Sequence, residues 1–295
     1  MENKIKGDVK KKFLTLPAII IVALVTQIPL LLTIYYSLFR WIIVRPDLPR
    51  KFVGLIYYMN LFSSSEFWLV FRNTLVLTFF SLASCLVLGI VLALLLYRQF
   101  PGVGIARTLL ISPFFIMDSV IGVFWRNVML EPSFGLLHYI YNFFSFKSPE
   151  MLAKSPLFVI SILVIWKWTP FFMLVLMAGL QSIPEEIIEA AVVDGTNSWN
   201  RIYRIILPML MKYITISLML GLIFILKTFG LVFTTTHGGP GFASTNFPYY
   251  VYRTAFLGWN IGKGSSIAII IVIISLALIM VLFRLLRKAI TEAEA

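Results

Sequence analysis

The chain has 295 residues, of which 60% are hydrophobic and 13% charged, and its mean hydropathy is +0.93. A soluble domain is about 45–50% apolar and about 25% charged, so this composition excludes a disordered chain, a collagen-like protein and a simple cytosolic enzyme, and it indicates a membrane protein. Its 25 Lys and Arg residues against 13 Asp and Glu residues give a net charge of +12, which fits either a nucleic-acid partner or basic loops that orient a membrane protein.

Six stretches are apolar enough to cross a bilayer, which takes about 20 residues in a helix. They predict an all-α membrane protein whose spans cover about 13–39, 74–96, 108–125, 156–180, 213–233 and 265–283. The third span is the shortest and contains Pro113 and Asp118. No shift in composition divides the chain, so 1–295 is predicted to be a single transmembrane domain.

The basic residues are unevenly distributed between the two sides of the predicted membrane. With six spans both termini lie on one side, and that side carries 13 Lys and Arg residues against 8 on the other. Cytoplasmic loops are richer in Lys and Arg than external loops. The bias predicts cytoplasmic termini, and it explains the positive charge without nucleic acid as a partner.

The loop 181–212, between the fourth and fifth spans, predicts two short helices. Ser182 with Glu185 three residues later has the pattern of a capping box, and Pro184 suits an early helical position that does not need an N–H. Gly195 stands where a left-handed residue would end the first helix. The first helix is therefore expected to run from about residue 184 to Asp194.

The second helix of this loop is expected to start at about Asn197. Its apolar face gathers aromatic and aliphatic side chains: Trp199, Ile202, Tyr203 and Ile206. Pro208 is expected to interrupt it before the fifth span begins. Two apolar helices on the cytoplasmic side fit the groove of a protein partner, and they equally fit a segment that lies on the lipid surface.

The same loop contains a motif with long and fixed spacing. It consists of Glu189-Ala190-Ala191, then Asp194-Gly195, and then Ile205 and Leu207-Pro208. The motif resembles the EAA motif of membrane subunits in ATP-binding-cassette importers that depend on a solute-binding protein. The resemblance implies the type I importer permease fold, with the two short helices coupling to an ATPase. It also implies a polar contact or local cap at Glu189, and at Gly195 a turn that a side chain would strain.

Further motifs extend the resemblance over most of the chain and are similar to the maltose-type sugar branch. They include Asn73-Thr74-Leu75, Arg107-Thr108-Leu109 and His237-Gly238-Gly239-Pro240-Gly241. The stretch 232–246 is similar to polyol permeases, so the implied substrate is a sugar or a sugar alcohol. The chain departs from the branch at 40–73, which is too short for a large external insertion, and at His237, where Gly or Asn is more usual.

Three ionisable residues lie inside predicted spans: Asp118, Lys167 and Lys227. A charge at mid-bilayer costs about 2.5–3.5 kcal/mol on insertion scales and usually faces a cavity or a partner. The alternative for Lys167 is snorkelling to the interface, and the alternative for Asp118 is a place close to the external surface. Lys227 is too deep in its span to snorkel easily.

The resemblance also implies a substrate pathway lined by the fourth and fifth spans. By offset from the motifs its residues are Trp168, Thr169, Phe172, Lys227 and Thr228, and Asp118 joins them as an embedded charge. Aromatic rings stack on the apolar faces of sugars, and polar groups pair with hydroxyls. The alternative role of Trp168 and Phe172 is to anchor the chain in lipid.

The sequence contains no recognisable catalytic or metal-binding motif. The stretch 258–263 resembles a Walker A loop but has one residue too few between its glycines, and two isolated His residues with Cys85 make no metal site. The resemblance therefore implies no cofactor in this chain, with ATP and Mg²⁺ bound by a partner ATPase.

The implied assembly lies in the bacterial inner membrane. Its other members are a second permease subunit, two ATPase subunits, an external solute-binding protein and the sugar or polyol substrate. The rival interpretation is a secondary transporter driven by an ion gradient, with Asp118 and Lys227 as its relay.

Overall fold

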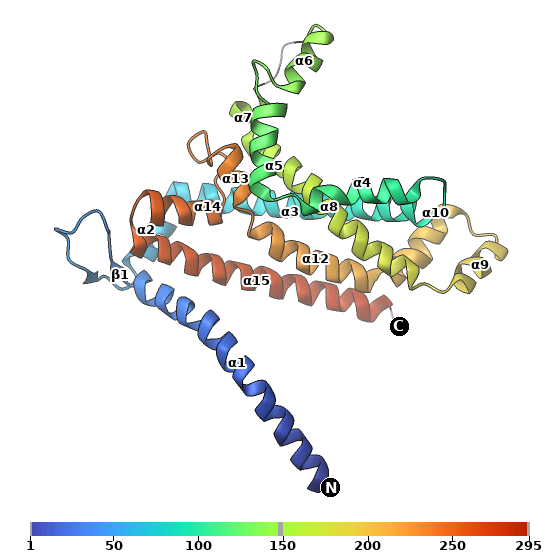
Figure 1. Ribbon diagram of the computed structural model, residues 1–295, viewed down its shortest axis with the longest axis horizontal. Helices are drawn as coiled ribbons and strands as arrows, with labels where there is room; N and C mark the ends of the chain where they lie inside the picture. The colour runs from blue at the N-terminus through green and yellow to red at the C-terminus, as the bar shows by residue number, and fades with distance from the viewer. Residues whose placement is uncertain (1, 147–149, 294–295) are drawn as a thin grey trace. The chain divides into compact units, whose positions relative to one another are not determined.

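The computed structural model describes residues 2–146 and 150–293, and it is almost entirely helical (Figure 1). The first half contains α1 (Glu2–Ser37), β1 (Phe39–Arg40), β2 (Lys51–Phe52), α2 (Ile56–Phe62), α3 (Ser65–Tyr97), α4 (Val103–Phe115), α5 (Asp118–Phe124), α6 (Leu136–Phe143) and α7 (Met151–Lys154). The second half contains α8 (Pro156–Gln181), α9 (Glu185–Val193), α10 (Ser198–Arg201), α11 (Leu207–Met209), α12 (Met211–Leu226), α13 (Gly230–Thr235), α14 (Phe247–Tyr252) and α15 (Ile261–Ala293). Three π-helical turns occupy Trp125–Met129, Ile202–Ile206 and Arg253–Leu257.

Four of the six predicted spans are continuous helices that are long and apolar enough to cross a membrane. They are Leu16–Ser37, Ser65–Tyr97, Pro156–Gln181 and Ile261–Leu286. The other two are bent pairs, Val103–Phe115 with Asp118–Met129 at 98° and Ser198–Met209 with Met211–Leu226 at 65°. The all-α membrane fold is confirmed, with up to six spans among the described residues when each bent pair counts as one.

The prediction of a continuous third span over 108–125 is wrong. The backbone becomes extended at Ile116 and Met117, and α5 starts afresh at Asp118. An acidic residue in the first turn of a helix is favoured by the helix dipole, so Asp118 suits a new helix start. The fifth span also differs from its prediction of 213–233, because α12 ends at Leu226 and α13 begins only at Gly230.

Contacts within the chain divide it into two compact units, and the smaller comprises residues 2–64 and 250–272. Its strands pair antiparallel, with Phe39 opposite Phe52. The first two turns of α15 pack closely here: Ser266 Oγ donates to the carbonyl oxygen of Ser37 at 3.1 Å, and a side chain at Gly262 would collide with the carbonyl of Phe39. The loop between α1 and α2 is therefore tied to the start of α15.

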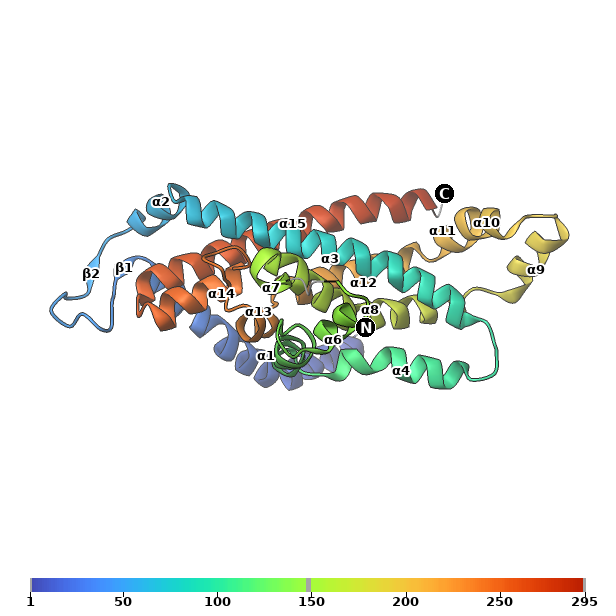
Figure 2. The same ribbon diagram turned by 90° about the horizontal axis from the view of Figure 1, so that it is seen from above.

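The larger unit comprises residues 65–249 and 273–293. Its centre is formed by α3 and α8, which pack along their length, with α12 against both (Figure 2). Phe172 of α8 is completely buried there, and a Cβ atom at Gly89 of α3 would lie 2.6 Å from its Cβ. Gly221 of α12 accommodates the tip of the same ring. Small residues let membrane helices approach closely, so these two glycines set the spacing of the three helices.

Candidate functional site

The start of α9 differs from its prediction. Ser182 Oγ donates to the carbonyl oxygen of Gly179 at 2.7 Å, and the N-cap residue of α9 is Pro184, with no side-chain cap bond. The predicted capping box of Ser182 with Glu185 is therefore wrong, because the serine completes the end of α8 instead. Glu185 and Glu186 do fall in the first turn of α9, where the helix dipole favours negative charge.

The end of α9 confirms the role predicted for Gly195. This residue has φ +76°, its N–H donates to Val192 at 3.0 Å, and the N–H of Thr196 donates to Ala191 at 3.1 Å. These two bonds form a Schellman motif, which satisfies carbonyls that a helix end leaves free. A Cβ atom at Gly195 would meet no atom within 4 Å, so a side chain here would be opposed by the left-handed backbone and not by crowding.

The motif residues of α9 divide between an inner and an outer face. Ala191 is buried, while Glu189, Ala190 and Asp194 are exposed. Beside them Val193 is 87% exposed. An exposed face that mixes aliphatic side chains with carboxylates is typical of a surface that meets another protein. Glu189 makes no side-chain hydrogen bond within the described residues, so the local cap expected of it is absent there.

The second helix of the loop begins as predicted at Asn197, whose side chain accepts from the N–H of Asn200 at 2.8 Å. It continues as a π-helical turn and passes through Pro208, and the break falls at Leu210. The predicted interruption before the fifth span is therefore present, but it falls two residues beyond Pro208.

The predicted apolar face of this second helix is split in the structure. Ile206 is buried and Ile202 packs beside it. Trp199 and Tyr203 are exposed, and their rings stack with centroids 6.1 Å apart. The segment thus holds to the membrane helices with one part of its apolar surface and leaves an aromatic pair uncovered.

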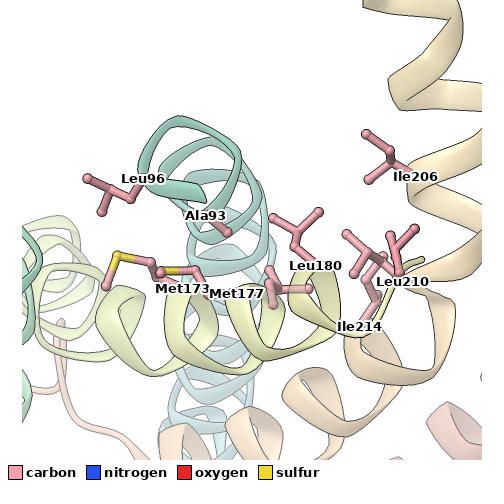
Figure 3. Packing of buried hydrophobic residues seen from close by; sticks show 10 residues of the cluster. Ala93, Leu96, Met173, Met177, Leu180, Ile206, Leu210 and Ile214 are labelled. Atoms are coloured by element: carbon pink, nitrogen blue, oxygen red, sulfur yellow. The ribbon is translucent and has the colours of Figure 1, made fainter. Parts of the chain in front are cut away.

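A hydrophobic core anchors the loop to the membrane helices (Figure 3). This loop cluster is made of Ala93 and Leu96 of α3, Met173, Leu176, Met177 and Leu180 of α8, and Ile183, Ile206, Leu210 and Ile214. Leu207 of the EAA-like motif packs against it, and Ile205 is half-buried. The loop is therefore packed directly against α3, α8 and the start of α12.

At the other end of α3, one amide side chain gathers a distant loop. Asn73 Nδ2 donates to the carbonyl oxygens of Phe242, Ala243 and Thr245 at 2.9, 3.2 and 3.3 Å. The hydroxyl of Thr74 accepts from the N–H of Phe247 at 3.0 Å. We call this arrangement the Asn73 clasp. It joins the motif Asn73-Thr74-Leu75 to the stretch 242–247, which lies far along the sequence.

The backbone conformation of His237 explains why Gly or Asn is more usual at this position. Its φ is +52°, in the left-handed region that Gly and Asn tolerate best. Arg126 Nη1 lies 3.0 Å from His237 Nδ1. Because a guanidinium can only donate, Nδ1 accepts and the ring proton is on Nε2.

The embedded charges form a pair that the sequence did not predict. Lys167 of α8 makes an ion pair with Asp118, and its Nζ donates to the carbonyl oxygen of Ile116 at 3.0 Å. The lysine thus holds both sides of the break between α4 and α5. Gly230 of α13 lies against Asp118, where a Cβ atom would come within 2.7 Å of the aspartate Cβ.

Lys227 does not join this pair. It is the exposed C-cap residue of α12, where the helix dipole favours a cation. The relay of Asp118 with Lys227, which the rival interpretation needs, is absent from the described residues, since the carboxylate is paired with Lys167.

The residues expected to line a substrate pathway separate into two groups. Phe172, Thr169 and Thr228 are buried by packing within the chain, and Thr169 Oγ1 donates to the carbonyl oxygen of Ile165 at 2.7 Å. In this arrangement of the chain they have almost no surface for a solute, and their place in a substrate pathway stays a prediction. Trp168, Lys227 and Asp118 retain exposed surface.

Trp168 belongs to an aromatic cluster that sequence reasoning missed. Its ring stacks on Phe224 of α12 with centroids 4.8 Å apart and planes inclined by 11°. Phe114 of α4 and Phe171 complete the cluster. No sequence signal marks Phe224 or Phe114, because each lies among many other apolar residues of its helix.

Comparison with known proteins identifies the protein family. Residues 102–292 match the family described as "Binding-protein-dependent transport system inner membrane component". The chain belongs to this family. A probable ABC transporter permease of Sinorhizobium fredii, y4oQ, is 35% identical over 93% of this chain and 89% of its own length. The trehalose/maltose transport system permease MalF of Thermococcus litoralis is 31% identical over 95% of this chain and 97% of its own.

A solved structure confirms the fold of this permease. A bacterial ABC transporter involved in the import of the acidic polysaccharide alginate contains a chain with a TM-score of 0.79 and 23% identity. The match covers 97% of this permease and 98% of that chain. The protein is thus a multi-pass membrane permease subunit of an importer and not an enzyme. Membership in a binding-protein-dependent family replaces the ion-gradient interpretation.

Proposed function

We propose that this permease forms half of the translocation pathway of an ATP-driven carbohydrate importer. Its partners are a second permease subunit, two ATPase subunits that bind ATP and Mg²⁺, and an external solute-binding protein. The observation that carries the carbohydrate assignment is the near full-length match to the trehalose/maltose permease of Thermococcus litoralis. A sugar or a sugar alcohol is the proposed substrate class.

The loop 181–212 is the proposed contact with the ATPase. Support comes from the exposed face of α9, where Glu189, Ala190 and Asp194 lie beside Val193, and from the loop cluster beneath it. ATP-driven closure of the ATPase dimer would push α9, and the tightly packed loop cluster would carry that movement to α8 and α12. The pathway would then alternate between its two openings.

The proposed orientation places both termini and this loop in the cytoplasm of a bacterial inner membrane. The excess of Lys and Arg on that side supports it. Trp168, with Asp118 and Lys227, is the proposed pathway surface. Support for this comes from Lys227, which is exposed, from Trp168 and Asp118, which are half-buried, and from the aromatic cluster around Trp168, since stacked rings suit the apolar faces of sugars.

Two measurements on the reconstituted importer test the proposed function. The solute-binding protein of the importer is titrated calorimetrically against disaccharides, polyols and glycerol phosphate, and a carbohydrate is expected to bind. Proteoliposomes with the whole complex are then expected to take up that ligand only with ATP and a functional ATPase. Uptake that survives inactivation of the ATPase contradicts the mechanism, and a binding protein selective for amino acids contradicts the substrate class.

A further inference from the structure

An apolar groove separates α3 from the second helix of the loop. It encloses about 500 Å³. The wall on α3 consists of Val87, Ile90, Val91, Leu94 and Leu95, the opposite wall of Trp199, Ile202, Tyr203 and Leu207, and Arg98 lies at one end. We call it the Arg98 groove. The exposed aromatic pair Trp199 and Tyr203, which the coupling motif leaves unexplained, forms one of its edges.

The length of the groove matches one leaflet of a bilayer. Arg98 lies eleven positions after Val87, and α3 ends at Tyr97. At 1.5 Å per helical residue this is about 16 Å along the axis. Half of a hydrocarbon core of about 30 Å is about 15 Å. A groove that starts near the midplane and ends at a helix terminus has the reach of one extended acyl chain.

The ends of the groove differ in charge. Its deep end is aliphatic, while Arg98 is an exposed cation at the membrane edge. No acidic residue is among the described side chains that line the groove, and Arg98 has no hydrogen-bond or ion-pair partner in the described part of the chain. Trp199 and Tyr203 stand on the opposite wall, and Trp and Tyr are enriched at the level of lipid headgroups.

We propose that the Arg98 groove binds an anionic phospholipid, with one acyl chain between α3 and the loop and the phosphate on Arg98. The largely apolar walls disfavour a polar ligand, and Arg98, the cation among the described residues that line the groove, selects an anionic headgroup. This inference goes beyond the proposed function and needs from it only that the loop lies at a membrane surface. The lipid then bridges a membrane helix and the segment proposed to meet the ATPase.

The test is lipid binding by the purified, delipidated importer complex, measured by native mass spectrometry. Phosphatidylglycerol and phosphatidylcholine are titrated in parallel, and the spectrum reports complex assembly as well. The wild-type complex is expected to retain phosphatidylglycerol preferentially. Arg98→Gln is expected to weaken this binding about fivefold and to remove the headgroup preference. Val91→Trp, at an exposed groove position, is expected to weaken the binding of both lipids.

Arg284→Gln is the matched control, because Arg284 is an exposed arginine near the end of α15 and does not line the groove. It is expected to bind phosphatidylglycerol like the wild type. Equal retention of the two lipids overturns the proposal, as does an Arg98→Gln complex that binds like the wild type. Equal losses in the Arg98 and Arg284 variants would mean diffuse attraction and overturn it too. If another subunit covers the groove, the wild-type complex does not bind phosphatidylglycerol preferentially, and this result also overturns the proposal. Transport is not measured, so these results are independent of the substrate assignment.

Discussion

Removing one member of the Asp118–Lys167 pair should harm the permease more than removing both. Asp118→Asn keeps the shape of the side chain and leaves the Lys167 ammonium with neutral acceptors. Lys167→Met keeps the length of the chain and leaves a carboxylate without its cation. The double variant has neither charge, so nothing ionised remains buried at the break between α4 and α5.

The exposure of the two side chains sets the size of each effect. Lys167 is 11% exposed and Asp118 is 31% exposed. Removing one partner of a buried ion pair costs about 3–5 kcal/mol, because the other charge stays buried without its partner. We expect about 3 kcal/mol for Asp118→Asn, because the amide oxygen that replaces the carboxylate is still an acceptor for Lys167. In Lys167→Met water reaches the carboxylate, so we expect about 2 kcal/mol, with about 1 kcal/mol more for the unpaired carbonyl of Ile116. The double variant loses only that last contribution, about 1 kcal/mol.

The assay is thermal inactivation of the purified complex, followed as the fraction that remains assembled after heating. Both single variants are expected to lose assembly at clearly lower temperatures than the wild type, with the double variant between them and the wild type. Such a double-mutant cycle isolates the interaction of neighbouring groups. A double variant as unstable as the sum of the two single variants would refute the reasoning, because the charges would then act independently.

Two further predictions concern the loop and the Asn73 clasp. Gly195→Asp and Gly195→Asn introduce side chains of the same shape, and both residues tolerate a left-handed backbone. We expect about a tenfold loss of uptake in the aspartate variant alone, which would assign the effect to a negative charge at the ATPase contact. Equal losses with normal membrane insertion would contradict that assignment. Asn73→Leu leaves the carbonyls of Ala243 and Thr245 without their side-chain donor, while that of Phe242 still accepts from the N–H of Thr245, so the cost should be about 2 kcal/mol. Thr74→Val removes one acceptor and should cost about 1 kcal/mol. Protease cleavage within 237–246 should follow the same order, and equal cleavage would count against the clasp.

The continuous spans were predictable because hydropathy is a local property. The residues that make α8 apolar also determine its start and its end, and the predicted 156–180 differs from Pro156–Gln181 by one residue. The break in the third span depends on a residue far along the chain. Lys167 satisfies the Ile116 carbonyl from 51 positions away, and the sequence of α4 and α5 carries no sign of it.

The loop shows the same contrast at shorter range. Gly195 was identified because a left-handed helix end is a demand of the local backbone. The sequence misleads at Ser182, because its hydroxyl stands between the end of α8 and the start of α9. It donates to the carbonyl oxygen of Gly179 in α8 and does not cap α9. The burial of Phe172 was likewise unpredictable, since it requires Gly89 and Gly221 on two other helices.

The Asn73 clasp has a consequence for the order of events during synthesis and membrane insertion. Its donor and its acceptors are 169 to 172 positions apart, so the ribosome has made α3 long before the acceptors exist. Until the chain reaches Thr245, the amide of Asn73 near the start of α3 lacks the full set of acceptors that it has in the finished fold. The clasp can therefore form only after the chain has been synthesised as far as Thr245. A chain truncated before residue 242 therefore lacks every acceptor of the Asn73 amide and cannot form the clasp.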